Sequence, residues 1–311
     1  MAVDKSILEA KAILEAKSIL EANHVSFAYG PGKWAIRDMS FALHSPRKVA
    51  LLGANGVGKS TLMLLLNGTL RPHEGELCIL GKPLDYSKAG QQWLHRKVGI
   101  VLQDPDVQLF GATVEQDVAF GPLNNGIESA AARLLVKQTL DSLAIGHLAD
   151  RPIHQLSLGE KKRVALAGVL VLEPEIILLD EPTAGLDFVG ITSMLNLLGK
   201  LHQAGTTIVI STHDTDLAYE WAEEAWILLD GHIAAQGPIE TVMQQRETLA
   251  AAHLRIPWLV EIGQAMEAIS TRPPSDSLPR NRDEMLARIE EAGSPAIGRK
   301  NALFIYNRKL L

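Results

Sequence analysis

A glycine-rich segment at residues 53–60, with the sequence GANGVGKS, constrains this chain more than any other stretch. It fits the pattern G-x-x-x-x-G-K-[ST] and lies between a strand-like apolar run at 49–52 and a helix-like run at 61–66. In that context glycines let several backbone N–H groups converge on phosphate oxygens, and the helix N-terminus adds partial positive charge. The segment therefore predicts an α/β fold with a phosphate-binding loop, against the alternative of a chance match.

Two side chains of this loop have specific expected tasks. Lys59 would reach the outer phosphates of a nucleotide, and the Ser60 hydroxyl would ligate Mg²⁺. The other nucleotide-binding positions predicted in the segment are Gly53, Asn55, Gly56, Gly58 and Thr61.

The composition limits the partners and the compartment. The net charge of −6 argues against nucleic acid held by a general basic surface and against attraction to anionic lipid. Cys78 is the one cysteine, so an intramolecular disulfide and a cysteine zinc cluster are excluded, and the reducing cytoplasm is the simplest compartment. No apolar run approaches the length of a membrane span, and charges interrupt the N-terminal apolar residues, which argues against a signal peptide.

The chain opens with three copies of a hexapeptide, at residues 5–10, 11–16 and 17–22. We interpret the earlier copies as an extension before the fold, although the composition favours helix and a functional role stays open. The last copy runs into a predicted first strand that ends near residue 27. The expected division is an N-terminal extension at 1–18, a nucleotide-binding domain at 19–240 and a C-terminal helical extension or dimerisation segment at 241–311.

Apolar runs without alternation indicate parallel strands that are covered on both faces. Helical periodicity replaces them over residues 113–172, so the whole predicts an α/β core with a helical insertion. The expected strands are 36–43, 49–52, 76–80, 98–102, 176–179, 206–211 and 225–229, and beyond residue 240 we expect helix at 240–254 and 283–292 with a linker at 271–279.

A second motif narrows the chemistry. Residues 176–181, IILLDE, form an apolar run that ends in Asp180 and Glu181. Beside a phosphate-binding loop, Asp180 would hold Mg²⁺ directly or through water, and Glu181 would orient or deprotonate the attacking water. The alternative is a solvated acidic turn, which the following sequence PTAGLD makes unattractive.

Together these motifs resemble those of the ATP-binding subunits of ABC transporters over about residues 19–240. Further resemblances lie at the signature LSLGE (156–160), the Q-loop Gln103, the D-loop AGLD (184–187), the switch His213 and the adenine-stacking Tyr29. The resemblance implies a P-loop NTPase core with an antiparallel β subdomain, a helical subdomain at about 104–172 and a small helical C-terminal extension. ATP and Mg²⁺ are the implied cofactors.

The resemblance also implies a mechanism in which two such subunits, expected to be identical, dimerise head to tail around two ATP molecules. Ser157 and the Gly159 N–H would contact the γ-phosphate held by the other copy. The implied catalytic residues are Glu181, His213, Gln103 and Lys59, the implied Mg²⁺ ligands are Ser60, Gln103 and Asp180, and Asp187 of the D-loop joins the nucleotide contacts. Two residues depart from the family signature LSGGQ: Leu158 cannot easily adopt positive φ, and Glu160 brings negative charge near the phosphates.

Residues 103–122 resemble the ATPases of energy-coupling-factor importers, closest to those for cobalt and nickel; a vitamin importer is the alternative. There this region contacts an integral membrane coupling subunit, so Leu109 and Phe110 are expected as exposed anchors, unless both pack inside the helical subdomain. A membrane substrate-binding subunit would act indirectly, and the ATPase would sit peripherally at the cytoplasmic face of the cell membrane. The transported metal has no predicted ligand pair here.

Two other classes of function were weighed. A soluble ABC-type ATPase of DNA repair would need a long insertion between Lys59 and Ser157, where the interval is too short, and a translation factor would carry two ATPase domains. A module that only binds ATP would not need both Lys59 and Glu181. We therefore predict an ATP-hydrolysing subunit of an importer, with no nucleic-acid partner.

Overall fold

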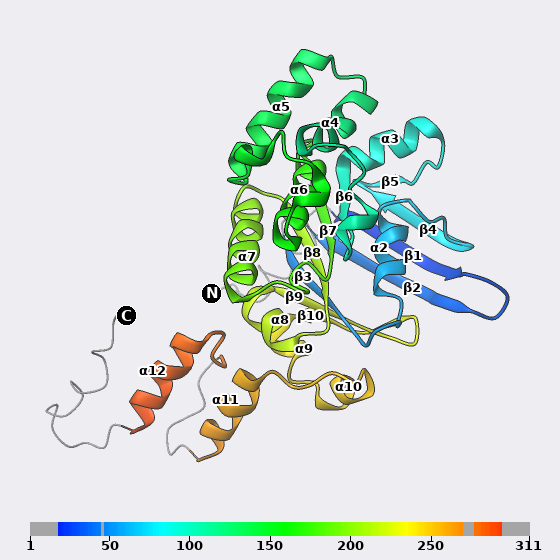
Figure 1. Ribbon diagram of the computed structural model, residues 1–311. Coiled ribbons are helices and arrows are strands. Elements are labelled where there is room, and N and C mark those ends of the chain that lie inside the picture. Colours follow the sequence, from blue (N-terminus) through cyan, green and yellow to red (C-terminus); the bar gives the residue numbers. More distant parts are fainter. Residues whose placement is uncertain (1–17, 45–46, 270–276, 294–311) are drawn as a thin grey trace, which may run out of the picture. The chain divides into compact units, whose positions relative to one another are not determined.

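The computed structural model describes residues 18–44, 47–269 and 277–293. It divides into two compact units, Met1–Arg255 and Ile256–Leu311, which are described separately (Figure 1). The first two copies of the hexapeptide and residues 271–276 of the predicted linker lie outside the described residues. Every motif singled out above belongs to the first unit.

A six-stranded sheet forms the centre of the first unit, in the order β10-β9-β3-β8-β7-β6. Five of its strands run parallel and β10 pairs antiparallel with β9. The bounds are β3 Lys48–Leu52, β6 Val98–Val101, β7 Ile176–Asp180, β8 Thr207–Thr212, β9 Glu224–Leu229 and β10 His232–Pro238. Every residue of β7 and β8 is buried, which explains why residues 176–179 and 208–210 form unbroken apolar runs.

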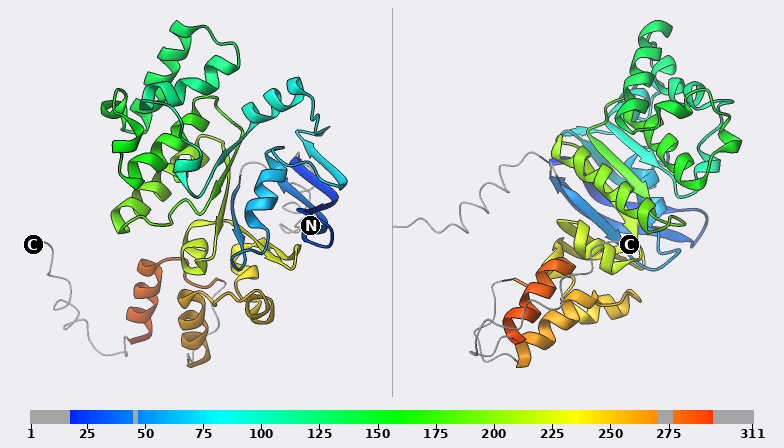
Figure 2. Two further views of the ribbon diagram at one scale, coloured as in Figure 1. Left: turned by 45° about the vertical axis from the view of Figure 1, so that its right-hand side comes forward. Right: turned by 60° about the vertical axis from the view of Figure 1, so that its left-hand side comes forward.

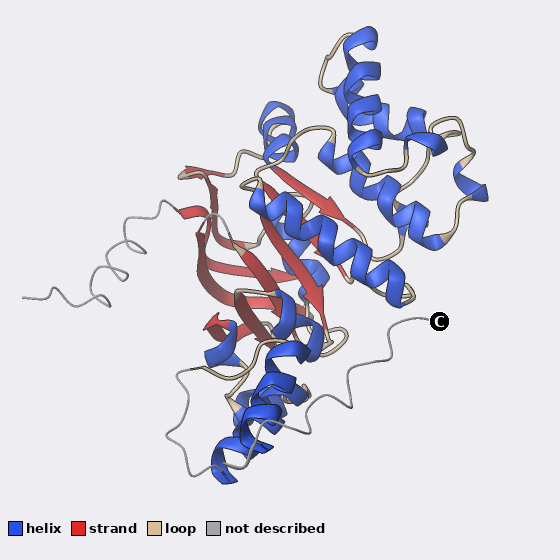
Figure 3. Cartoon of the chain, turned by 90° about the vertical axis from the view of Figure 1, so that its left-hand side faces the viewer, coloured by secondary structure: helices blue, strands red, loops and turns tan. Residues whose placement is uncertain are grey.

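A four-stranded antiparallel sheet, in the order β2-β1-β4-β5, is the second layer. Its strands are β1 Ser18–Ala28, β2 Trp34–His44, β4 Glu74–Ile79 and β5 Lys82–Pro83. The last hexapeptide copy lies almost wholly within β1, where Leu20 pairs with Leu43 and Ile79 on the two sides. The two sheets lie side by side in Figure 3 (red).

The buried core joins both sheets through helix α2 (Lys59–Leu66). Leu62, Met63, Leu65 and Leu66 of this helix are buried among apolar side chains from both sheets. Between the sheets, the rings of Phe41 in β2 and Trp226 in β9 lie 4.6 Å apart. The backbone N–H of Arg37 also donates to the carbonyl of Gly231, at 2.9 Å.

The helical subdomain contains α4 (Val114–Asn124), α5 (Ser129–Ser142) and α6 (Leu158–Leu170), which contact one another. They group together at one end of the parallel sheet in both views of Figure 2 (green). The short 3₁₀ helices of this region are η1 Pro105–Val107, η2 Gly146–Leu148 and η3 Ile153–Gln155. The predicted α/β core, antiparallel β subdomain and helical subdomain are therefore confirmed.

The remaining helices of the first unit are α3 (Lys88–Lys97), α7 (Phe188–Gln203), α8 (Thr215–Trp221), α9 (Ile239–Val242) and α10 (Arg246–Ala251). The predicted helix 240–254 is thus two short helices. Both contact β9, so the division between the units falls after Arg255 rather than near residue 240. The second unit contains α11 (Trp258–Ile269) and α12 (Arg282–Gly293), the latter close to the predicted helix 283–292.

Of the two residues predicted to be exposed anchors, Phe110 is exposed and Leu109 is not. Phe110 is 64% exposed, but Leu109 is only 8% exposed. The cause is the turn after η1, where the buried Asp117 carboxylate accepts from the N–H groups of Phe110 and Gly111, both at 2.8 Å. In this turn the two neighbouring side chains end on opposite sides, Leu109 inward and Phe110 outward.

In the described part of the chain, no helix combines the length and the apolar character needed to cross a bilayer.

Candidate active site

The phosphate-binding loop connects β3 to α2, as predicted. Gly53, Gly56 and Gly58 have φ values of 153°, 79° and 113°, which side-chain-bearing residues rarely adopt. A Cβ on Gly58 would lie 2.7 Å from the carbonyl oxygen of Ala35, so this glycine is also needed for close approach. No side chain caps α2 at Gly58, and its first N–H groups are therefore available to an anion.

Lys59 is the first residue of α2, and its side chain folds back over the phosphate-binding loop. Its ammonium donates to the carbonyls of Gly53 and Ala54, at 2.8 and 3.1 Å, and the side chain is buried. Burial lowers the pKa of Lys59, while the carboxylates of Glu181 and Asp180 oppose that shift. The ammonium is thus held at the place where a phosphate chain would meet the loop.

Asp180 stands at the end of β7, beside the start of α2. Its carboxylate accepts from the Ser60 hydroxyl at 2.5 Å and, through its other oxygen, from the Ser211 hydroxyl of β8. A hydroxyl and a carboxylate side by side are oxygen ligands of the kind that Mg²⁺ prefers. The parallel register of β7 and β8 places Asp180 opposite Ser211 and so creates this arrangement.

Glu181 is buried and follows β7 with a φ of 45°. Its backbone N–H donates to the Ser211 hydroxyl at 3.0 Å, so the next strand holds the residue in this uncommon conformation. Its carboxylate lies 2.9 Å from Nδ1 of His213, which follows β8 and has a 62% exposed side chain. A carboxylate facing an exposed imidazole can accept a proton from a bound water.

Aromatic side chains border the same site on the β subdomain. Tyr29 is 64% exposed after β1, and its hydroxyl lies 3.2 Å from the hydroxyl of Thr61. Trp34, 41% exposed at the start of β2, lines the cavity too, as does Lys33. Trp34 and Lys33 were not predicted from the sequence as cavity residues. The position of Trp34 only a few residues after Tyr29 could have indicated a second aromatic side chain at the site.

One cavity of about 580 Å³ collects most of the predicted residues. Those that line it are Tyr29, Asn55, Gly56, Gly58, Lys59, Ser60, Thr61, Gln103, Asp180, Glu181 and His213. Four predicted residues do not line it: Gly53, Ser157, Gly159 and Asp187. Gly53 lies below the loop, where a Cβ would come within 2.6 Å of the Leu228 carbonyl oxygen.

Comparison with known proteins decides the family. The family model described as ABC transporter matches residues 36–184. A cobalt import ATP-binding protein, CbiO of Rhodobacter capsulatus, is 45% identical over 267 residues, 85% of this chain and 95% of the relative. The chain belongs to the ABC transporter ATP-binding family. A second relative, the energy-coupling factor transporter ATP-binding protein EcfA of Methanocaldococcus jannaschii, is 45% identical over 231 residues, 74% of this chain and 83% of the relative.

A solved structure agrees with the assignment to ABC ATPases. It is cbiO1 from Clostridium perfringens, described as part of the ABC transporter complex cbiONQ, with a TM-score of 0.68 and 40% identity over 81% of this chain and 99% of that one. The energy-coupling-factor type and the ATPase activity inferred from the motifs are therefore confirmed.

The ABC signature lies at the start of α6, and both of its departures from the usual sequence fit a helix N-terminus. Leu158 is the first helical residue, so the leucine does not need positive φ. Ser157 and Glu160 form a capping box: the N–H of Ser157 donates to the Glu160 carboxylate at 2.7 Å, and the Ser157 hydroxyl accepts from the N–H of Glu160 at 3.4 Å. The hydrogen bonds from Ser157 lower the pKa of Glu160.

The D-loop lies next to the signature of the same subunit. A Cβ on Gly185, where φ is 74°, would lie 2.7 Å from Cδ2 of Leu158. Asp187 is the N-cap of α7, with its carboxylate accepting from the N–H of Gly190 at 2.7 Å. Ser157, Leu158 and Asp187 are exposed and do not line the nucleotide cavity of this ABC ATPase, whereas Ala184 at the start of the D-loop does line it.

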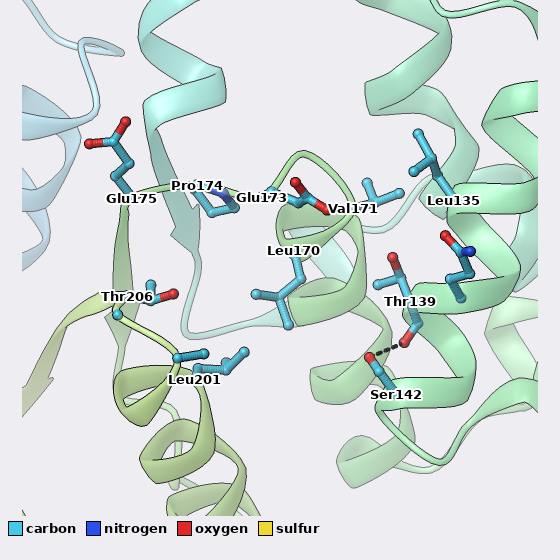
Figure 4. Close-up of a pocket in the computed structure, with 13 residues that line it drawn as sticks. Leu135, Thr139, Ser142, Leu170, Val171, Glu173, Pro174, Glu175, Leu201 and Thr206 are labelled. Atoms are coloured by element: carbon cyan, nitrogen blue, oxygen red, sulfur yellow. Dashed lines mark hydrogen bonds between the residues drawn. The ribbon is translucent and has the colours of Figure 1, made fainter.

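A second hollow, of about 540 Å³, lies between the helical subdomain and the core (Figure 4). Leu135, Thr139 and Ser142 of α5 face Leu170, Glu173 and Leu201 across it. None of the ABC motif residues lines it, and we assign the nucleotide to the first cavity.

Proposed function

We propose that this ABC ATPase energises an importer of cobalt or nickel ions, working as a dimer on integral membrane subunits at the cytoplasmic face of the membrane. The observation that carries the proposal is the meeting of Lys59, Ser60, Asp180, Glu181 and His213 in one cavity. The metal cargo is inferred from the name of the relative CbiO. A vitamin importer is the alternative cargo class.

The cavity fits ATP with Mg²⁺. Free N–H groups at the start of α2 and the Lys59 ammonium suit phosphates, and the exposed ring of Tyr29 offers a surface on which a base can stack. Ser60 and Asp180 present adjacent oxygens for Mg²⁺, with Gln103 on the cavity wall as a further ligand. The ion would neutralise phosphate charge there.

Glu181 is the residue that this geometry favours as general base. Its carboxylate is buried and opens toward the cavity, where it would orient an attacking water and take its proton. His213 contacts that carboxylate at 2.9 Å and would keep it directed at the water. Lys59 would hold the outer phosphates in place for in-line attack.

A second copy would complete the site. Ser157 and Gly159 lie outside the cavity of their own chain, at an exposed helix start where the Gly159 N–H would be offered to a phosphate. Exposed apolar residues lie close to the D-loop, namely Phe188 (83%) and Val189 (72%), and such residues are common at interfaces between proteins. We propose that the signature of one copy contacts the γ-phosphate bound by the other.

Replacement of Ser157 tests this dimer. Asp and Asn both cap helices well, so Ser157→Asp and Ser157→Asn are expected to preserve α6, while only Asp places a negative charge against phosphate. In a Glu181→Gln background, ATP should dimerise the Asn variant and leave the Asp variant monomeric by light scattering. Equal ATP-dependent dimerisation of the two variants would contradict the trans contact.

The proposed coupling surface consists of Val107, Phe110, Phe120 and Leu123. All four side chains are exposed, by 71%, 64%, 49% and 46%, and the rings of Phe110 and Phe120 meet edge to face with centroids 4.5 Å apart. Exposed aromatic pairs of this kind suit an apolar helix of a partner. We propose that the membrane coupling subunit contacts residues 103–122 here.

Phe110→Asp is expected to abolish co-purification with the membrane subunits while leaving the ATPase rate of the isolated protein within about twofold, because an exposed change rarely alters the fold. The matched control is Leu134→Asp in α5, which exchanges another exposed apolar side chain, 58% exposed, of the helical subdomain. Retained binding by Phe110→Asp, or equal loss in both variants, would contradict the assigned surface.

Uptake identifies the cargo. The ATPase is reconstituted in vesicles with the membrane subunits that co-purify with it, and ATP-dependent accumulation of Co²⁺, Ni²⁺ and vitamins is measured. Accumulation of Co²⁺ or Ni²⁺ that stops in Glu181→Gln supports the proposal. Accumulation of a vitamin alone would assign the alternative, and the absence of ATP-dependent uptake would remove the transport function.

A further inference from the structure

The first turns of α6 carry a buried cation that the proposed chemistry does not use. Lys162 is 3% exposed, and its ammonium donates to the carbonyl oxygens of Glu181 at 3.0 Å and of Pro182 at 3.1 Å. Among the described residues, no carboxylate lies within ion-pair distance of this ammonium. Burying an ammonium costs several kcal/mol of solvation free energy, and an apolar residue would fill the space without that cost.

The carbonyl groups that Lys162 holds belong to a strained part of the backbone. Glu181 has a φ of 45°, and such conformations of non-glycine residues cost about 1–3 kcal/mol and persist only where surrounding contacts enforce them. Ser211 holds the N–H of Glu181 from one side, at 3.0 Å. Lys162 holds its carbonyl from the other side, so the residue is fixed at both of its peptide groups.

We propose that Lys162 is a positioning residue for Glu181: its ammonium fixes the 181–182 backbone so that the Glu181 carboxylate faces the nucleotide cavity and His213. The Lys162 side chain reaches this backbone from the helix that begins at Ser157. A shift of α6 would therefore move the Glu181 peptide group, and the signature would be linked to the general base of its own subunit. This inference rests on the proposed role of Glu181 as the base.

Lys162→Met tests the inference in the full-length protein. A misplacement of about 1 Å at a catalytic group can lower a rate about 10²-fold, so kcat for Mg-ATP is expected to fall roughly 10- to 100-fold. The KM for ATP should stay within about twofold, because substrate binding and catalytic positioning are separable in KM and kcat. The melting temperature should change little, because the variant loses two hydrogen bonds to backbone carbonyls but also removes a buried charge.

Lys161→Met is the matched control. It makes the same chemical change one residue earlier on α6, but the ammonium of Lys161 pairs with the exposed carboxylate of Asp106, at 2.6 Å, away from Glu181. Its kcat is expected to stay within about twofold of the parent, because exposed ion pairs contribute little. A similar fall of kcat in Lys161→Met would mean that any change in this turn of α6 disturbs the site.

A double-mutant cycle separates positioning from a general structural role. If Lys162 acts through Glu181, Lys162→Met should not lower the residual turnover of Glu181→Gln further, because residues acting as a unit are not additive. A structural defect would lower the residual rate and the affinity for ATP in both backgrounds. Additive losses, or an unchanged kcat in Lys162→Met alone, overturn the inference.

Lys162→Gln keeps the experiment decisive if the methionine variant does not fold. Glutamine is polar but too short to reach both carbonyls, so the same loss of kcat is expected, and an unchanged kcat would overturn the inference. The proposed function fails differently: if Glu181→Gln retains parental turnover, the base assignment is wrong whatever the Lys162 variants do.

Discussion

Glu181→Gln should bind ATP with nearly parental affinity and lose turnover. Glutamine has almost the shape of glutamate but cannot accept a proton from water, and loss of a general base typically costs about 10²- to 10⁴-fold in rate. The Glu181 carboxylate is buried and lies 2.9 Å from His213. Because a carboxylate does not attract phosphate, its loss should not weaken the binding of ATP. Single-turnover hydrolysis and a fluorescent-nucleotide titration would measure the two quantities separately.

Glu175→Gln is a suitable control for that experiment. Glu175 lies at the opposite end of β7 from Asp180, and its carboxylate pairs on the surface with Lys97 at 2.7 Å. Both variants replace a glutamate beside the same strand, but only one faces the cavity. Parental hydrolysis by Glu181→Gln, or an equal loss in Glu175→Gln, would refute the assignment of the base.

Lys59→Met should lose affinity for ATP itself. The ammonium lies at the start of α2 and is already held over the loop by the carbonyls of Gly53 and Ala54. Loss of a buried charged contact costs about 2–5 kcal/mol, so the dissociation constant should rise by a factor between roughly 30 and 4,000. Isothermal titration with Mg-ATP measures this directly.

The Lys59 variant is not expected to fail by unfolding. Lys59 is buried, and methionine fills nearly the same space without burying a charge, so the melting temperature should stay near the parental value. Lys97→Met, which removes a half-buried lysine outside the nucleotide cavity, is the control for loss of charge. A dissociation constant for Lys59→Met within about threefold of the parent would contradict the phosphate contact.

Local sequence predicted the parts of the site that lie on continuous segments. The loop glycines, Lys59 and Ser60 are read from one pattern, and the carboxylates of Asp180 and Glu181 follow from one apolar strand. The local pattern could place these residues because a strand buried on both faces is mostly apolar, and because a loop with positive φ needs glycine.

Contacts between distant segments were the part that sequence reasoning missed. The local sequence assigns Lys162 no role, whereas its ammonium contacts the backbone beyond β7. Ser211 gave no signal inside an apolar strand, yet it bonds both Asp180 and the N–H of Glu181. Leu109 was predicted to be exposed because neither the turn after η1 nor its hydrogen bonds to Asp117 can be read from the local pattern.

The contact between Phe41 and Trp226 has a mechanical consequence. Because these rings join β2 to β9 inside one continuous core, the layer that carries Tyr29 and the layer that carries the phosphate-binding loop cannot slide past each other without breaking packed apolar contacts. The surfaces proposed to bind the base and the phosphates of ATP therefore belong to one rigid part of the protein. Within the first unit, a rearrangement that spares this packing would be confined to α4, α5 and α6, the green helices of Figure 1, which follow β6 in the chain.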